Sequence, residues 1–221
     1  MTPARTALLA IDLQNEYRPG AAWPIVGYDA VLANTATLLN AARSSGAAVF
    51  HVQAWVEESE RSAYRRQDEG IEAEFRSAVA GSAAADICEE VAPVSGDQVL
   101  RKQWPSAFRD TDLDARLRGL GVETLIVVGV LTDSCVRASV FDAVYAGYRV
   151  WLVKDATGSM TDAMHRTAVL DMANRLYGGA VLRTADAVSA LRGEPHTAWR
   201  CTRPVEFAYE IDTIDSLYEA L

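Results

Sequence analysis

The sequence has few cysteines, few histidines and no long apolar run. Its three cysteines, Cys88, Cys135 and Cys201, are widely spaced and form no C-x-x-C pair, so neither a disulfide framework nor a zinc motif is indicated. No apolar run approaches the ~20 residues of a membrane span, and the N-terminal run reaches Asp12 too early for a signal peptide. We therefore expect a cytoplasmic protein that makes no contact with a membrane.

Basic residues are also in the minority, because 21 Lys and Arg stand against 30 Asp and Glu, for a formal net charge of -9. Such a chain repels phosphate backbones and anionic lipids, so nucleic acid is not an expected partner. What the sequence does have is apolar residues, 50% of its 221, which is ordinary for a globular protein with one sizeable core. Small uncharged or polar molecules are the ligands that this composition leaves open.

Short apolar runs alternate along the chain with segments of helical period. The expected strands are residues 7–11, 47–52, 98–101, 125–128, 149–153 and 180–182, and the expected helices are 28–44, 112–120, 135–147, 163–177 and 185–191. Strands and helices alternating at this spacing predict an α/β fold, in which helices cover both faces of a parallel sheet. A short helix is expected at 71–80, and the polar residues 55–70 form either a lid or, in the favoured interpretation, a solvated surface segment.

The last part of the chain differs from the rest. No composition break or linker precedes Gly193, so residues 1–192 are predicted to form one domain. Residues 193–221 are rich in aromatic side chains and end in a possible helix at 214–221. Because this extension is too apolar for a disordered end, we expect it to pack on its own subunit or on a neighbouring one.

Three ionisable residues follow expected strands, namely Asp12, Lys102 and Cys135. Ligands of open α/β sheets bind beyond the carboxyl ends of the strands, where these residues lie. Taken singly, each has an ordinary explanation as a loop cap, a surface lysine or a small core residue. Together they supply the base, the cation and the thiol for nucleophilic attack on a carbonyl. The start of a helix at Cys135 is expected to lower the pKa of its thiol.

Three motifs resemble the isochorismatase-like cysteine hydrolases, a superfamily that includes the N-carbamoylsarcosine, maleamate and ureidoacrylate amidohydrolases. They are LLAIDLQNEY (8–17), RKQWPSAFRDTDLDARLRGLGVETLIVVGVLTDSCVRAS (101–139) and DAVYAGYRVWLVKDATGS (142–159). The resemblance implies a three-layer, doubly wound sandwich with a six-stranded parallel sheet in the order 3-2-1-4-5-6. It also implies hydrolysis of the C–N bond of a small amide or N-carbamoyl compound through a thioester, without a cofactor, by a homodimer or homotetramer.

The resemblance assigns the catalytic triad to Asp12, Lys102 and Cys135. It further implies a cis peptide bond between Val130 and Leu131, so that the backbone NH groups of Leu131 and Cys135 form an oxyanion hole. Substrate-lining residues are expected among Tyr17, Trp55, Trp104, Phe108, Leu131 and Arg137. For Trp104 and Phe108 core packing is an equal alternative, and Arg137 either binds a substrate carboxylate or pairs with an acidic residue of a neighbouring subunit.

Histidines give little support for a metal site. The similar nicotinamidases carry an Asp and His cluster after the second strand, whereas here only His51 lies in that region, inside the strand. We interpret His51 as structural, expect no catalytic metal, and treat His165 and His196 as surface residues.

Two other functions stay open from the sequence. One is cleavage of a vinyl ether, as in isochorismatases proper, which does not need the cysteine. The other is a binding or redox-sensing protein, in which Cys135 would pair with Cys88 or Cys201.

Overall fold

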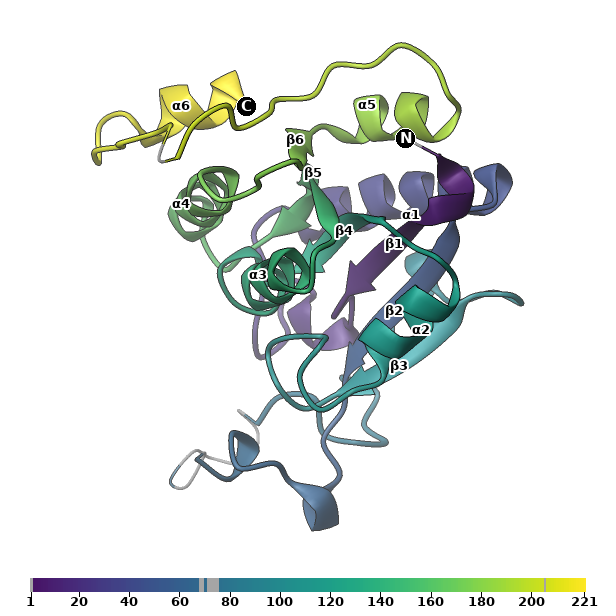
Figure 1. Cartoon of the computed structure of the whole chain (residues 1–221). Coiled ribbons are helices and arrows are strands. Elements are labelled where there is room, and N and C mark those ends of the chain that lie inside the picture. Colours follow the sequence, from purple (N-terminus) through teal and green to yellow (C-terminus); the bar gives the residue numbers. More distant parts are fainter. Residues whose placement is uncertain (1, 68–69, 71–75, 205) are drawn as a thin grey trace.

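A six-stranded parallel sheet forms the centre of the computed structural model, which describes residues 2–67, 70, 76–204 and 206–221 (Figure 1). The strands are β1 (Thr6–Ile11), β2 (Ala48–Ala54), β3 (Gln98–Lys102), β4 (Thr124–Val130), β5 (Arg149–Gly158) and β6 (Ala180–Leu182). Their order is β3-β2-β1-β4-β5-β6, and every neighbouring pair runs parallel. The predicted fold class and strand order are therefore confirmed.

The central strands are buried on both faces, which is why they appear in the sequence as unbroken apolar runs. Alternate residues of β1 point to opposite sides: Leu8 and Ala10 belong to one core cluster, and Ala7 and Leu9 to the other. The first cluster includes residues of α1 (Tyr28–Ser45) and α5 (Thr184–Leu191), and the second includes residues of α2 (Leu113–Gly119), α3 (Arg137–Tyr145) and α4 (Asp162–Ala173). Helices thus cover both faces of the sheet, giving three layers (Figure 1).

Several element boundaries differ from the prediction. β5 continues to Gly158 because its last residues pair with β4 again after a register shift. The helix expected at 163–177 ends at Ala173. The helix expected to begin at Cys135 instead begins at Arg137, and Cys135 lies in a π-helical turn, Thr132–Val136, which we call the cysteine turn.

The helix expected at 71–80 falls mostly on residues outside the described part of the chain, 71–75. The described remainder of that stretch is not helical, and Val79 pairs with Val56 in an isolated bridge.

Gly129 allows β1 and β4 to pair closely just before the strands end. Its φ is +115°, and a Cβ added there would lie 2.0 Å from the carbonyl oxygen of Ile11. A side chain at this position would collide with the backbone of β1, so only glycine fits. The close pairing places Asp12, the residue after Ile11, next to the start of the cysteine turn.

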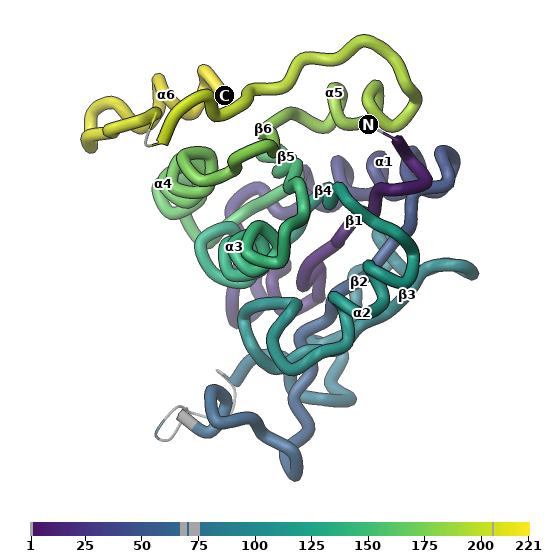
Figure 2. Tube along the Cα trace, viewed as in Figure 1, coloured from purple at the N-terminus to yellow at the C-terminus, as the bar shows by residue number. Residues whose placement is uncertain are grey.

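The C-terminal extension lies against β6 and α4 of its own chain. Trp199 exchanges two backbone hydrogen bonds with Val181 of β6, with N–O distances of 2.9 and 3.0 Å. Asn174, directly after α4, bonds both backbone groups of Phe207. The last helix, α6 (Ile214–Ala220), lies beside α4 at the upper end of the view in Figures 1 and 2. The segment after β2 lies at the opposite, lower end of the same view.

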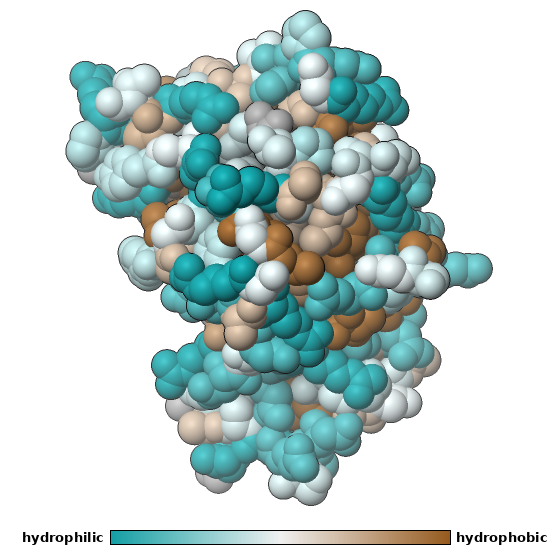
Figure 3. Space-filling model, turned by 45° about the vertical axis from the view of Figure 1, so that its right-hand side comes forward, coloured by the Kyte–Doolittle hydropathy of each residue, from teal (hydrophilic) through white to brown (hydrophobic). Residues whose placement is uncertain are grey.

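The surface is largely hydrophilic, with apolar residues gathered across the middle of the face in Figure 3. Within the described residues, no helix is both long and apolar enough to cross a membrane.

Candidate active site

Asp12 and Lys102 form a fully buried ion pair. Lys102 Nζ donates to Asp12 Oδ2 across 2.7 Å, and both side chains are 0% exposed. The second carboxylate oxygen, Oδ1, is buried and has no hydrogen-bond partner among the described residues. Asp12 also adopts a positive φ of 50°, which is uncommon outside glycine and is found most often at functional sites. One oxygen of this carboxylate is thus held by a cation, and the other is left for a further partner.

The sheet order explains how the pair forms. Asp12 directly follows β1, and Lys102 ends β3, with β2 between them. Strands lie about 4.8 Å apart, so the two backbones are roughly 10 Å apart, a distance that the Lys102 side chain, the hydrogen bond and the Asp12 side chain cover together. Burial lowers the pKa of Lys102, but the charge of Asp12, together with hydrogen bonding to Asp12 and Cys135, more than offsets it, and the pKa is raised overall. Lys102 therefore stays protonated.

The cysteine turn follows β4 and places the thiol beside this ion pair. The peptide bond between Val130 and Leu131 is cis. The carbonyl oxygen of Leu131 then accepts hydrogen bonds from the backbone NH groups of Ser134 and Val136, at 3.0 and 3.1 Å. Asp12 and Lys102 both act on the Cys135 thiol through charge and hydrogen bonding. The three residues expected to form a triad are thus brought together.

The pKa of Cys135 corrects the expectation of an acidic thiol. Although part of the residue is accessible, burial raises the pKa of Cys135 to about 11; Lys102 lowers it and Asp12 raises it. Position at the start of a helix favours the thiolate, but here burial and the adjacent carboxylate have the larger effect. At neutral pH the resting group is therefore a thiol with a carboxylate beside it.

A hydrogen-bonded serine links the cysteine turn to the lysine segment. Ser139 on α3 donates to the carbonyl oxygen of Cys135 at 2.7 Å and accepts from the backbone NH of Ala107 at 2.9 Å. Ser106 donates to Asp142, also on α3, at 2.5 Å. The chain after Lys102 is thereby fixed to the helix that follows Cys135. Beyond the presence of two serines near the site, no sequence pattern indicated this role.

The loop after β1 is held in place by Gln14, another residue that sequence reasoning passed over. Its side chain is buried, donates to the carbonyl oxygens of Ala54 and Ala85, and accepts from the backbone NH of Ala54. Tyr17 lies further along this loop and is also buried. Burial, followed by the charge of Asp12, raises the pKa of Tyr17, and Cys135 contributes to the same shift. Tyr17 therefore lies near the triad, and its role as a substrate-lining residue stays a prediction.

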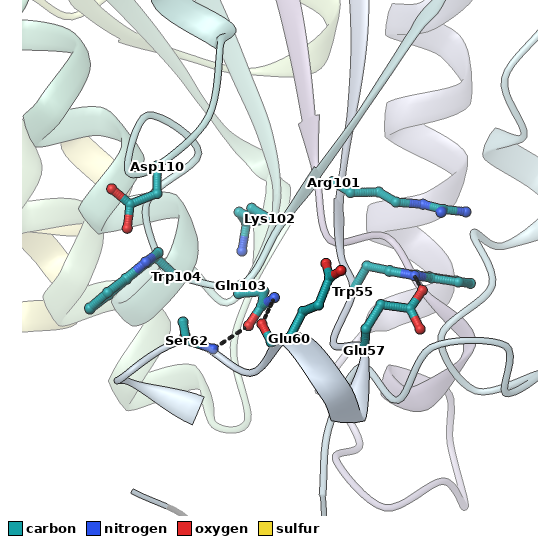
Figure 4. A pocket seen from close by; sticks show the side chains of 9 residues that line it. All are labelled: Trp55, Glu57, Glu60, Ser62, Arg101, Lys102, Gln103, Trp104 and Asp110. Atoms are coloured by element: carbon teal, nitrogen blue, oxygen red, sulfur yellow. Dashed lines mark hydrogen bonds between the residues drawn. The ribbon is translucent and has the colours of Figure 1, made fainter. Parts of the chain in front are cut away.

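A pocket of about 400 Å³ adjoins the ion pair (Figure 4). It is lined by Trp55, Glu57, Glu60, Ser62, Arg101, Lys102, Gln103, Trp104 and Asp110. In Figure 4, Trp104 and Asp110 lie on one side of Lys102 and Trp55 and Arg101 on the other. Lys102 belongs both to the ion pair and to the pocket wall. The pocket is a candidate substrate site that lies next to the triad, since Lys102 lines it while Asp12 and Cys135 do not, and part of the segment after β2 forms its wall.

Four of the expected substrate-lining residues do not line this pocket: Tyr17, Phe108, Leu131 and Arg137. Phe108 packs on the core cluster beside α2 and α3, with its ring 6.0 Å from that of Tyr148. Arg137 pairs with Asp171 of the same chain at 2.7 Å. Trp55 and Trp104 line the pocket, and partly buried Leu131 packs on the core cluster beside α1.

The histidines are all engaged with the protein. His51 is buried in β2 and bonds Asp97 at 3.0 Å. His196 is exposed, with its ring 5.6 Å from that of Trp151. The interpretation of His165 as a surface residue without partners is wrong: it is partly buried and bonds both Thr132 and Tyr218. Among the described residues, no group of three or more His, Cys, Asp or Glu is placed to hold a metal ion.

The six-stranded parallel sheet is that of solved isochorismatase family proteins, such as one from Desulfovibrio vulgaris with a TM-score of 0.76 at 31% identity, covering 85% of this chain and 98% of that one. Residues 6–194 match the Isochorismatase domain, so the chain belongs to the isochorismatase family, and the resemblance drawn from the motifs is confirmed. A maleamate amidohydrolase of Pseudomonas putida is 34% identical over 193 residues, 85% of this chain and 87% of that protein.

Solved structures agree with this assignment. A cysteine hydrolase from Pseudomonas syringae pv. phaseolicola 1448A has a TM-score of 0.79 at 25% identity, covering 87% of this chain and 95% of that one. An N-carbamoylsarcosine amidase from Thermoplasma acidophilum has a TM-score of 0.68 at 27% identity, covering 81% of this chain and 96% of that one.

Proposed function

We propose that this hydrolase is a cysteine-dependent amidohydrolase that cleaves the C–N bond of a small amide or N-carbamoyl compound. The observation that carries the proposal is the buried Asp12–Lys102 pair with Cys135 beside it, because a base, a fixed cation and a thiol are what acyl transfer requires. The similarity to maleamate amidohydrolase and N-carbamoylsarcosine amidase supports the same reaction class.

In the proposed first half-reaction, the sulfur of Cys135 attacks the amide carbonyl carbon while Asp12 accepts the thiol proton. Because the pKa of Cys135 is raised to about 11, proton transfer accompanies attack instead of preceding it. The backbone NH groups of Leu131 and Cys135 stabilise the oxyanion. Asp12 then passes the proton to the leaving nitrogen, the C–N bond breaks, and a thioester remains.

In the second half-reaction, water replaces the departed amine. Asp12 removes a proton from the water, whose oxygen attacks the thioester carbonyl. The C–S bond breaks, the carboxylic or carbamic acid is released, and the proton returns to Cys135. Lys102 holds Asp12 in one orientation during both steps, because its ammonium group is fixed 2.7 Å from Oδ2.

Ammonia release from a panel of primary amides and N-carbamoyl compounds, including maleamate and N-carbamoylsarcosine, tests the proposal. We expect release from at least one compound and its loss in Cys135→Ala. Cys201→Ala is the matched control, since Cys201 lies in the C-terminal extension and we expect full activity. Release that persists in Cys135→Ala, or no release from any compound, would contradict the proposal. Cytoplasmic location and assembly as a homodimer or homotetramer are part of the same proposal, and light scattering measures the assembly.

A further inference from the structure

Two hydrogen bonds connect the C-terminal helix to the cysteine turn. Tyr218 of α6 bonds His165 through its hydroxyl, with the oxygen 3.0 Å from Nε2. The other ring nitrogen of His165, Nδ1, lies 2.9 Å from the hydroxyl oxygen of Thr132. Thr132 is the first residue of the cysteine turn and directly follows Leu131. A continuous polar path therefore runs from the end of the chain to the proposed oxyanion hole.

Packing fixes the members of this path. Thr132 is completely buried and Tyr218 nearly so. The Tyr218 ring meets the His165 ring edge to face, with centroids 5.4 Å apart at 70°. The buried Lys154 of β5 donates to the carbonyl oxygen of Tyr218 at 2.6 Å and lies 4.5 Å from the centre of its ring. Contacts with both the sheet and α4 thus hold Tyr218 in place, so its hydroxyl has a defined position.

His165 is neutral under ordinary conditions, because burial, followed by the charge of Arg166, lowers its pKa to about 4. A neutral imidazole has one donor nitrogen and one acceptor nitrogen. The two hydroxyls of Thr132 and Tyr218 satisfy both, which fixes the ring orientation. Removing either hydroxyl leaves one ring nitrogen inside the protein without its partner, so the ring is free to turn.

We propose that Tyr218 and His165 are positioning residues, which hold Thr132 and thereby align the Leu131 amide with the oxyanion formed at Cys135. This inference rests on the proposed amidohydrolase mechanism. A separate hydrogen bond holds the next residue of the cysteine turn: Asp133 accepts from the hydroxyl of Ser159, which directly follows β5. Through Tyr218, α6 acts on the active site of its own subunit.

The test uses an aldehyde, which forms an oxyanion-like adduct without turnover. Addition of Cys135 to propionaldehyde forms one S–C bond, the carbonyl π pair moves to oxygen, and the thiol proton follows it. Protection of Cys135 from iodoacetamide gives the dissociation constant of the adduct. Alkylation itself develops no oxyanion, so its rate without aldehyde reports the thiol alone.

We expect Tyr218→Phe to raise the dissociation constant of the propionaldehyde adduct about tenfold, because an oxyanion donor is misaligned rather than lost. The rate of Cys135 alkylation without aldehyde should stay within about twofold of the unmodified protein. Thr132→Val should behave in the same way, and Thr132→Ser, which keeps the hydroxyl, should restore binding. The double variant Tyr218→Phe/Thr132→Val should be no weaker than either single one, because both break one path.

Glu219→Gln is the matched control for the docking of α6. It weakens the ion pairs of Glu219 with Arg166 and Arg183 but leaves the Tyr218 hydroxyl in place. Equal weakening of the adduct in Glu219→Gln and Tyr218→Phe would overturn the proposal, since the cause would be general loosening of the helix. An unchanged adduct in Tyr218→Phe, or additive effects in the double variant, would also overturn it. If the unmodified protein forms no adduct at Cys135, the proposed mechanism itself fails.

Discussion

Lys102 reaches Asp12 across the end of β2, and the two side chains form an ion pair with no exposure to solvent. Lys102→Met would leave the Asp12 carboxylate buried without its cation, which typically destabilises a protein by about 3–5 kcal/mol. We expect this loss in urea denaturation at pH 7. The double variant Asp12→Asn/Lys102→Met should lose less than the two single losses added together. Strict additivity would contradict a direct pairing.

Alkylation of Cys135 should be slow at neutral pH and rise with pH. Because the pKa of Cys135 is raised to about 11, its thiolate fraction at pH 8 is smaller than that of an ordinary thiol, and the rate should grow about tenfold per pH unit below the pKa. Mass spectrometry after timed iodoacetamide treatment measures the rate. A rate that levels off below pH 9 would contradict a raised pKa.

Asp12→Asn should affect alkylation and hydrolysis in opposite directions. The charge of Asp12 raises the pKa of Cys135, whereas Lys102 lowers it. Without that negative charge, the lysine has the larger influence, so Cys135 should be alkylated faster at pH 8. Amide hydrolysis should nevertheless be lost, because the proposed proton acceptor is gone. An alkylation rate that falls together with hydrolysis would count against Asp12 as the proton acceptor.

Gly129→Ala should destabilise the protein by about 3 kcal/mol or more. The added Cβ would lie 2.0 Å from the carbonyl oxygen of Ile11, so β1 and β4 would have to move apart. Gly193→Ala is the matched control: it also has a positive φ, +75°, but no heavy atom lies within 4 Å of its added Cβ. We expect a loss of about 1 kcal/mol there, measured by urea denaturation of both variants. Equal losses of stability in the two variants would show that the positive φ of Gly129, and not the collision with Ile11, causes the loss.

Substrate charge should matter in the pocket. Three carboxylates line it, those of Glu57, Glu60 and Asp110, while Lys102 is paired with Asp12 and Arg101 lies over Trp55 at 3.9 Å. Glu60→Gln should raise kcat/KM for an anionic amide about twofold to fivefold and leave a neutral amide unchanged. The gain should shrink at high salt. Glu58→Gln is the control, since Glu58 lies on the same turn outside the pocket wall. An equal gain in both variants would contradict a role for the pocket.

His165 should make the protein less stable in acid. Burial, followed by the charge of Arg166, lowers its pKa to about 4 from an ordinary 6.5, so between these values the unfolded chain binds more protons than the folded one. Its contribution to the free energy of unfolding is therefore complete above about pH 6.5 and is lost as pH falls towards 4. His165→Gln removes this titration. Between pH 7 and pH 4.5, urea denaturation should show a smaller decrease in the free energy of unfolding for His165→Gln than for the unmodified protein. Equal decreases would contradict the assignment of this pH dependence to His165.

The sheet could be predicted because its strands are buried on both faces and therefore leave unbroken apolar runs in the sequence. The strand-end positions of Asp12, Lys102 and Cys135 followed from those runs. The boundaries that failed depend on tertiary pairing: β5 continues past Val153 because it pairs again with β4 after a register shift. No local pattern contains that information.

The charge state of the site could not be predicted either. The pKa of Cys135 depends on burial by segments far away in the sequence, which outweighs the favourable position at a helix start. His165 looked unpartnered because its partners, Thr132 and Tyr218, lie 33 and 53 residues away. The pocket wall similarly combines residues after β2 with residues after β3.

The triad residues and part of the pocket wall come from different parts of the fold, which differ in how freely their sequence can change. Asp12, Lys102 and Cys135 are fixed by the ends of central strands, where a shift of one residue would disturb the whole sheet. Trp55, Glu57, Glu60 and Ser62 come from a connection outside the sheet, where insertions and substitutions are tolerated. Changes in this connection can therefore alter part of the pocket wall while the strand-end positions of Asp12, Lys102 and Cys135 stay the same.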